Sequence, residues 1–157
     1  AAVNFGLYKN AIRSQERAAA TAAERAAVWG GAFGVMHDAK VLSRRGLFLT
    51  ELGTTATLLF AINCIGDDDL DFPSDAAGPA LVGSTVGLLI MATGTISGTG
   101  MNPARDLGPR LITALASGPK VALGPTPPWI YTFGPLAGAL TGCAAYKAFK
   151  GLLDADA

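Results

Sequence analysis

Three long stretches with almost no charge limit what this chain can fold into. Residues 76–104 and 121–146 contain no Asp, Glu, Lys or Arg, and residues 46–66 contain one charged side chain, Glu51. At about 1.5 Å per residue, a helix over any of these stretches is long enough to cross a hydrocarbon core of roughly 30 Å. Charged residues make up 15% of the 157 residues, against about 25% in soluble domains. The pattern favours an integral membrane protein over a soluble protein with unusually apolar buried helices.

We expect three full membrane spans, at about residues 46–66, 79–95 and 126–147, followed by a short polar tail. The third span repeats glycine every four residues, at Gly134, Gly138 and Gly142. Small residues at this spacing let two helix backbones approach closely inside a membrane, where no hydrophobic effect separates protein from lipid. The repeat therefore predicts a tightly packed neighbouring helix, but it indicates nothing about function.

The segments around the spans are expected to be polar connections. Residues 1–15 look like the end of another apolar helix and are too short to cross the bilayer alone. The Ala-rich residues that follow favour helix up to Trp29, where Gly30–Gly31 should break it. His37 lies later in this connection, and we assign it no role because a lone loop histidine is usually solvated. The acidic run at residues 67–79 could hold a cation, but such runs with Pro and Gly are more often solvated turns.

Other function classes find little support in the sequence. Net charge is zero, so the composition gives no reason to expect a nucleic-acid partner. No cluster of His, Cys or carboxylates has catalytic spacing, and we expect neither an enzyme nor a metal site. Cys64 and Cys143 lie inside predicted spans and are interpreted as small apolar residues rather than as a disulfide. No signal peptide is expected, and the initial Ala indicates a segment of a longer or processed protein.

The stretch SGTGMNPARDLGPR, residues 97–110, directly follows the second span. Asn is among the best helix N-caps and Pro is favoured at the first helical position, so Asn102–Pro103 should start a helix. Helix-compatible sequence ends near Ser117, which makes this helix roughly 20 Å long and too short to span the bilayer. Irregular backbone at membrane depth, as expected for residues 98–101, must be buried in protein or face a water-filled cavity. A re-entrant half-helix lining a polar passage satisfies this rule; a capped helix in an aqueous loop is the alternative.

The stretch and its surroundings resemble the aquaporin, or major intrinsic protein, family. MNPARDLGPR is similar to the family's second Asn-Pro-Ala loop, FLTELGTTATLLF, GLLIMATG and PWIYTFGPLAGA resemble its fourth to sixth spans, and FGLYKNAI resembles the end of its third. The family fold consists of six tilted helices in two inverted repeats, with two half-helices that meet at the midplane. The resemblance implies an all-α membrane protein, an aquaporin-like helical bundle with three full spans, the end of a fourth and one re-entrant half-helix. Residues 1–157 would form one partial channel domain that lacks the first Asn-Pro-Ala loop.

The resemblance also implies a passive channel for water and small neutral solutes such as glycerol, without a cofactor. The half-helix would point its partly positive N-terminus, at the Asn102, Pro103 and Ala104 motif, toward the pore centre. The Asn102 amide would donate hydrogen bonds to a solute. The backbone carbonyls of the preceding strip, chiefly those of Gly98, Gly100 and Met101, would accept hydrogen bonds from it. A cation would meet the positive helix end and lose its water without compensation.

The selectivity filter implied by the family contains Arg105, Thr99 and Gly94. An arginine inside a membrane is costly and should face a cavity, where it would donate to the solute and repel cations. A structural pairing of Arg105 with Asp106 is the alternative. Glu51 matches a buried glutamate that holds the loop by accepting its backbone N–H groups, as a buried carboxylate requires.

Other positions bear on the choice of solute. Asp106 and Arg110 match the glycerol-conducting branch, whereas Tyr131 is more similar to the water-conducting branch. Thr132 is not the large aromatic residue typical of water channels, and the small filter residues suggest a wide opening. The segment before the motif is several residues shorter than usual, so the Gly94 assignment depends on where the gap is placed. We expect conduction of glycerol and water; the alternatives are a water-selective aquaporin and a non-conducting structural or regulatory half-channel.

Family members are homotetramers in a lipid bilayer, so a multi-pass protein of the plasma membrane or an internal membrane is implied. The family orientation places residues 67–78 in the cytoplasm, although this loop contains no Lys or Arg. Residues 16–45 contain the basic residues Arg17, Arg25, Lys40, Arg44 and Arg45. The positive-inside rule therefore predicts the opposite orientation. We retain the family orientation because the missing first helices can determine it.

Overall fold

The computed structural model describes residues 2–37, 39–70, 74–124 and 126–156, and it is helical throughout, with no strand in these ranges. The elements are α1 (Ala2–Ala18), α2 (Ala22–Phe33), α3 (Arg44–Ile65), the 3-10 helix η1 (Asp68–Leu70), α4 (Ser74–Ser97), α5 (Pro103–Ser117), α6 (Pro119–Leu123) and α7 (Pro128–Asp156). The all-α fold class is therefore confirmed.

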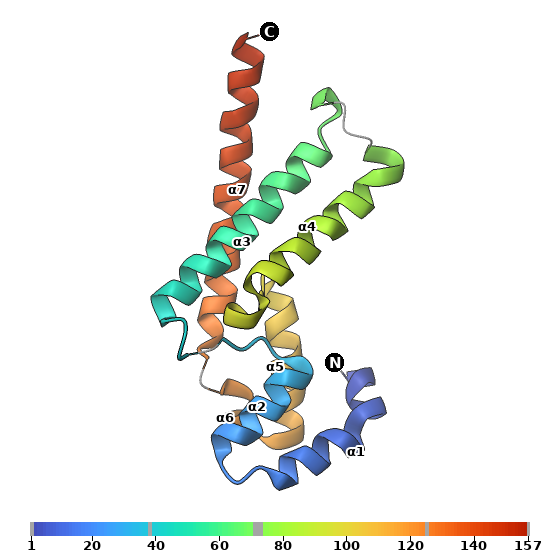
Figure 1. Cartoon of the computed structure of the whole chain (residues 1–157), viewed down its shortest axis with the longest axis vertical. Coiled ribbons are helices and arrows are strands. Elements are labelled where there is room, and N and C mark those ends of the chain that lie inside the picture. Colours follow the sequence, from blue (N-terminus) through green and yellow to red (C-terminus); the bar gives the residue numbers. More distant parts are fainter. Residues whose placement is uncertain (1, 38, 71–73, 125, 157) are drawn as a thin grey trace.

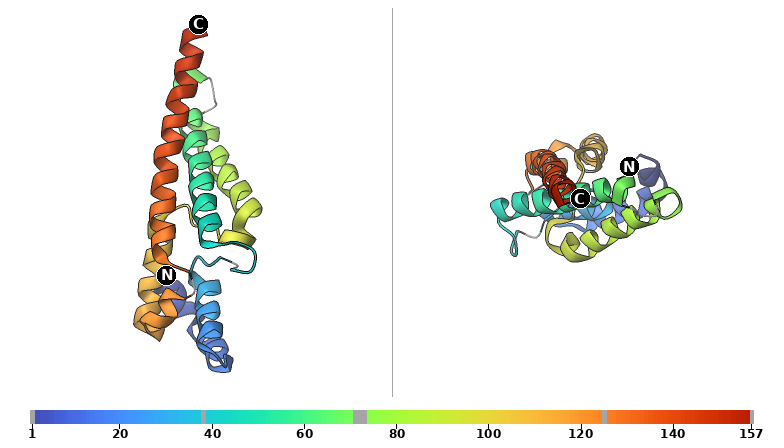
Figure 2. Two further views of the ribbon diagram at one scale, coloured as in Figure 1. Left: turned by 90° about the vertical axis from the view of Figure 1, so that its left-hand side faces the viewer. Right: turned by 90° about the horizontal axis from the view of Figure 1, so that it is seen from above.

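The molecule is elongated, with its long helices at one end and its short ones at the other (Figure 1). α3 packs along α7 and, less extensively, against α4. α1, α2, α5 and α6 gather at the opposite end, where α5 contacts α6 and the beginning of α7 (Figure 2). The loop between α4 and α5 lies where these two groups of helices meet, so elements from both groups can contact it.

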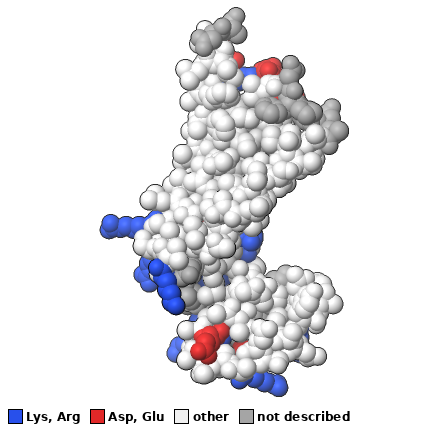
Figure 3. All heavy atoms as spheres, in the orientation of Figure 1, with Lys and Arg blue, Asp and Glu red and all other residues white. Residues whose placement is uncertain are grey.

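Two of the described helical segments, Arg44–Ile65 and Ala77–Ser97, are long and apolar enough to cross a membrane. Only 22% of the apolar window of the first and 6% of the second are buried, whereas a core helix of a soluble protein would be mostly buried. Figure 3 shows that the surface over α3, α4 and α7 is an uncharged band, and that charged side chains lie at the edges of this band and beyond it. The third expected span is present as α7, in which Gly, Pro, Thr and Tyr dilute the apolar residues.

The glycine repeat of α7 packs directly on α3, as its spacing predicts. A Cβ atom at Gly138 would lie 2.3 Å from the carbonyl oxygen of Leu52, and one at Gly142 would lie 2.3 Å from that of Ala56. At Gly134 the nearest atom, the Cβ of Glu51, would be 3.1 Å away. No side chain fits at Gly138 or Gly142. The absence of Cβ atoms at these two positions is what allows α3 and α7 to approach.

The predicted end of the Ala-rich helix is wrong. α2 begins after Thr21, whose side chain accepts a hydrogen bond from the Glu24 backbone in a capping box, and it continues through Gly30–Gly31 to Phe33. Glycine costs only about 1 kcal/mol per residue inside a helix, and the cap and the buried contacts of Trp29 offset this cost. The helix ends at Gly34, whose N–H donates to the Gly30 carbonyl.

The predicted polar tail is helical, and the prediction of a solvated acidic turn holds for the exposed Asp68 and Asp69 but not for Asp67. α7 continues to Asp156, and its Lys150 ammonium group forms ion pairs with Asp67, at 3.1 Å, and Asp69, at 2.7 Å. The Tyr146 hydroxyl donates to Asp67 as well. The loop after α3 is thus fastened to α7, and Asp67 is largely withdrawn from solvent. The rest of the run is partly outside the described residues, since 71–73 lie there.

Candidate pore-lining site

α5 begins where the motif predicts. Asn102 has extended backbone angles, φ −152° and ψ 118°, and its side-chain oxygen accepts a hydrogen bond from the Ala104 N–H at 2.9 Å. Pro103 occupies the first helical position, where a missing N–H has no consequence. The cap uses the oxygen of the Asn102 amide and leaves its NH₂ group pointing away from the helix backbone. Asn102 is exposed, so this donor lies on an open face of the described chain.

The strip before the cap has an unusual backbone. Gly98, Thr99 and Met101 all have positive φ angles, of 76°, 45° and 52°. The left-handed region is unfavourable for residues other than glycine and most of all for a β-branched residue such as threonine. Such a conformation persists only where surrounding contacts impose it. The strip must therefore be held from outside.

Glu51 of α3 provides part of that hold. Its carboxylate is fully buried and accepts hydrogen bonds from the N–H groups of Gly100, at 3.0 Å, and Met101, at 2.8 Å. This is the contact that the resemblance implies for Glu51. A buried carboxylate with two charge-assisted hydrogen bonds is stabilised, and it fixes the peptide groups that donate to it.

Tyr131 of α7 holds the strip from the other side. Its ring is fully buried and its hydroxyl donates to the Ser97 carbonyl. A Cβ atom at Gly100 would lie 2.7 Å from the Tyr131 ring and 3.0 Å from the Glu51 carboxylate. Tyrosine and glutamate therefore enclose Gly100 so closely that no larger residue fits there.

The side chain of Thr99 does not point to the open face. It is fully buried, and its hydroxyl lies 2.8 Å from that of Thr93 at the end of α4. The Thr99 backbone N–H donates to the Ser97 hydroxyl at 3.0 Å. Gly94 is adjacent, since a Cβ atom there would lie 3.8 Å from the Thr99 hydroxyl oxygen. The structure thus brings Gly94 and Thr99 together, but Thr99 offers its carbonyl rather than its side chain to the neighbouring Arg105.

Arg105 is exposed and turns back over the strip. One of its terminal nitrogens donates to the Thr99 carbonyl and to the Gly98 carbonyl, the latter at 3.3 Å. The same nitrogen lies 3.5 Å from the Gly100 carbonyl oxygen. The alternative pairing of Arg105 with Asp106 is wrong, because consecutive residues of a helix point in different directions. The guanidinium group is therefore held against the backbone carbonyls of the strip.

Asp106 pairs instead with Arg110, one turn further along α5. Their ion pair measures 2.7 Å, and the Asp106 side chain is fully buried. Arg110 also donates to the carbonyls of Ala122, at 2.8 Å, Leu123, at 2.9 Å, and Val35, at 3.3 Å. The pair thereby fastens α5 to α6 and to the segment before α3.

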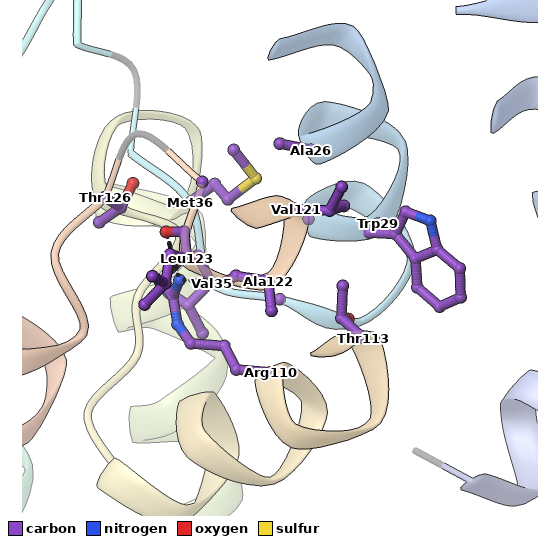
Figure 4. Close-up of a pocket in the computed structure, with 13 residues that line it drawn as sticks. Ala26, Trp29, Val35, Met36, Arg110, Thr113, Val121, Ala122, Leu123 and Thr126 are labelled. Carbon is purple, nitrogen blue, oxygen red and sulfur yellow. Dashed lines mark hydrogen bonds between the residues drawn. The ribbon is translucent and has the colours of Figure 1, made fainter. Parts of the chain in front are cut away.

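A small cavity of about 20 Å³ lies beside Arg110, between α2, α5, α6 and the segment before α3 (Figure 4). Its walls come mainly from apolar side chains, including Val35, Met36 and Val121. This volume holds about one water molecule. A solute of the size of glycerol does not fit, so the cavity is part of the packing behind the strip and no candidate passage.

The sequence matches the major intrinsic protein family over residues 11–146. It is 36% identical to the glycerol uptake facilitator protein of Pseudomonas aeruginosa over 104 residues, which cover 64% of this chain and 37% of that protein. It is 36% identical to the propanediol uptake facilitator PduF of Salmonella typhimurium over 107 residues, 66% of this chain and 40% of the relative. Aquaporin NIP1-1 of Zea mays is 37% identical over 100 residues, 64% of this chain and 32% of the relative.

The chain belongs to the major intrinsic protein family. As a member of this family it is an integral, multi-pass membrane protein. The matched segments span about two fifths or less of the curated relatives' length.

For this major intrinsic protein, the sequence analysis missed some residues that support the site and predicted the surroundings of another incorrectly. His37 is buried, at 8% exposed, and its Nδ1 atom lies 2.9 Å from the Thr126 hydroxyl, so the prediction of a solvated histidine is wrong. Thr93 and Ser97 support Thr99 through their hydroxyls. No local pattern identifies Thr126 as the partner of His37, because the two residues are 89 positions apart in the chain. Thr132, predicted as a supporting residue, donates its hydroxyl to the Pro128 carbonyl of its own helix at 3.2 Å.

Proposed function

We propose that the protein is a passive membrane channel for water and small neutral solutes such as glycerol, without enzymatic chemistry. The observation that carries this proposal is the exposed Arg105, whose guanidinium group contacts the carbonyls of Gly98 to Gly100 three residues after the exposed Asn102 cap. Donors and acceptors in one row suit a solute that carries hydroxyl groups. The glycerol and propanediol facilitators among the relatives support the same class of solute.

In this proposal, the solute exchanges its water for fixed groups of the protein. The Asn102 NH₂ group and Arg105 donate hydrogen bonds to a solute oxygen, and the carbonyls of the strip, including that of Met101, accept from its hydrogens. These exchanges keep the free-energy barrier to permeation low for a neutral molecule. A cation meets both the guanidinium and the partly positive end of α5, so it gains nothing for the water it loses.

A filter wide enough for glycerol is favoured by two features. Gly94 has no side chain, and the Thr99 side chain is buried against Thr93 instead of projecting over the open face. Asp106 and Arg110, the pair similar to the glycerol branch, support α5 from behind. A water-selective channel remains the second candidate, which the likeness to Aquaporin NIP1-1 favours.

We propose further that residues 1–157 act as one part of a channel domain. A segment resembling the other inverted repeat would form the pore wall opposite Asn102, and four copies of the protein would assemble in the bilayer. The exposed position of Asn102, Ala104 and Arg105 supports this arrangement, since an intramembrane arginine should face a cavity.

The function is tested by reconstituting the full protein into lipid vesicles and following their volume by light scattering. Under an outward glycerol gradient, the vesicle volume should change faster than in empty vesicles, because glycerol crosses the membrane. Under a gradient of an impermeant osmolyte, the volume should also change faster, because water crosses the membrane. Acceleration with the osmolyte alone would make the protein a water-selective channel. No acceleration with either would leave the non-conducting alternative.

A further inference from the structure

We propose that the first turns of α3 and α7 form a binding site for an anionic phospholipid. The two helices begin side by side (Figure 1), and a groove of about 510 Å³ lies between them. Arg44, Arg45, Phe48, Leu49 and Trp129 line this groove. The site lies apart from the proposed pore face and does not depend on the proposed solute.

The floor of the groove is apolar and open. The Phe48 and Trp129 rings are 6.1 Å apart and tilted by 38°, which joins the two helices at this level. Leu49 is 64% exposed and Trp129 is 51% exposed. Exposed apolar surface of this kind has no favourable contact with water, but it can bind an acyl chain.

The rim of the groove is cationic. Arg44 and Arg45 are exposed, and neither forms an ion pair with another residue in the described ranges. Guanidinium groups bind phosphate through two parallel hydrogen bonds, so an adjacent pair suits a phosphodiester. Figure 3 shows Lys and Arg side chains gathered at the lower edge of the uncharged band, where the proposal places the lipid headgroups.

Charge and depth together select the occupant. Arg44 is the first residue of α3, one of the helices able to span the membrane, and tryptophan is characteristic of the membrane–water interface. A lipid at this height would place its phosphate at the arginines and its chain along Phe48, Leu49 and Trp129. A zwitterionic lipid gains less, because its own cation opposes the two guanidinium groups.

The proposal is tested by lipid binding to the full protein. Phosphatidylglycerol and phosphatidylcholine are titrated into the detergent-solubilised protein, and bound lipid is counted by native mass spectrometry. Each basic residue near a lipid surface contributes about 1 kcal/mol, so R44Q/R45Q should bind phosphatidylglycerol about 30-fold more weakly, equivalent to about 2 kcal/mol. Phosphatidylcholine binding should be nearly unchanged.

The matched control is K9Q/R17Q. Lys9 and Arg17 lie exposed on α1 and, with Arg13, line a second groove that has no aromatic lining residue. This variant should bind phosphatidylglycerol as the wild type does. L49A should weaken the binding of phosphatidylglycerol while leaving both arginines in place. This variant therefore separates the contribution of the acyl-chain contact from that of the charge.

Three results would overturn the proposal. Equal loss in K9Q/R17Q would mean general charge attraction, and full competition by inorganic phosphate would mean an anion site with no lipid contact. A change of oligomeric state in R44Q/R45Q without added lipid would make the groove an interface between copies of this chain.

Discussion

The carboxylate of Glu51 lies 2.8 Å from the backbone nitrogen of Met101, a residue with a φ angle of 52°. A charge in the middle of a membrane-spanning helix thus meets the irregular strip that ends at the Asn102 cap. The two features depend on each other. The strip supplies N–H donors for a buried charge, and the charge holds peptide groups in a conformation that they would otherwise leave.

Replacing Glu51 by Gln should therefore destabilise the protein. The amide keeps one acceptor but turns its NH₂ group toward a backbone N–H, which leaves a buried donor unsatisfied at a cost of about 1–3 kcal/mol. We expect a lower thermal unfolding midpoint in detergent and slower glycerol uptake. E24Q is the control, because glutamine also serves at this capping-box position. An E51Q protein with wild-type midpoint and flux would show that the carboxylate holds nothing.

Replacing Arg105 by Val should loosen selectivity. The variant removes the guanidinium that covers the carbonyls of Gly98 and Gly100. A barrier lowered by about 1.4 kcal/mol corresponds to a tenfold higher rate, and we expect an increase of this order for polyols larger than glycerol. Vesicle swelling over a series of polyols measures it. R17V, a substitution on exposed α1, should behave like the wild type; identical solute cut-offs in both variants would remove Arg105 from the filter.

Replacing Gly138 by Ala should damage the fold more than its size suggests. The new methyl group would lie 2.3 Å from the Leu52 carbonyl, so α3 and α7 must separate, at a cost of about 1–3 kcal/mol or more. G87A is the matched control for G138A, since nothing lies within 4 Å of the Cβ position of Gly87 in α4. It should be neutral or stabilising by about 0.5–1 kcal/mol. Unfolding midpoints in detergent compare the two, and equal midpoints would contradict the close contact.

Acid should release the loop after α3 from α7. The Tyr146 hydroxyl, the Asp69 N–H and the Lys150 ammonium group hold the pKa of Asp67 below its usual value. A lowered pKa stabilises the fold above the unfolded-state value, near 3.9, and this contribution is lost as pH falls through the folded-state pKa. We expect the unfolding midpoint to fall below about pH 4 in the wild type and less steeply in D67N. Parallel pH profiles would show that Asp67 does not contribute.

Features that depend on neighbours in the chain were predictable. The Asn102–Pro103 start of α5 follows from a local cap, and the positions of α3 and α4 follow from the absence of charge. Helix geometry alone could also have paired Asp106 with Arg110, four residues away, rather than with Arg105.

Features that depend on distant contacts were not predictable. α7 continues past the expected end of the span, and its Tyr146 and Lys150 contact Asp67, which lies 79 and 83 residues earlier in the chain. The buried His37 contacts Thr126, 89 residues further along the chain. None of these partners has a sequence spacing that marks it.

The most direct test of the proposed pore is chemical block at Ala104, an exposed residue of the motif. Glycerol uptake by vesicles is measured for wild type and A104C before and after a small, neutral, water-soluble methanethiosulfonate. The wild type, with Cys64 buried and Cys143 half-buried, is the control. We predict that the reagent stops uptake through A104C and leaves the wild type unchanged. Undiminished uptake through fully labelled A104C would contradict a solute path along Asn102 and Arg105.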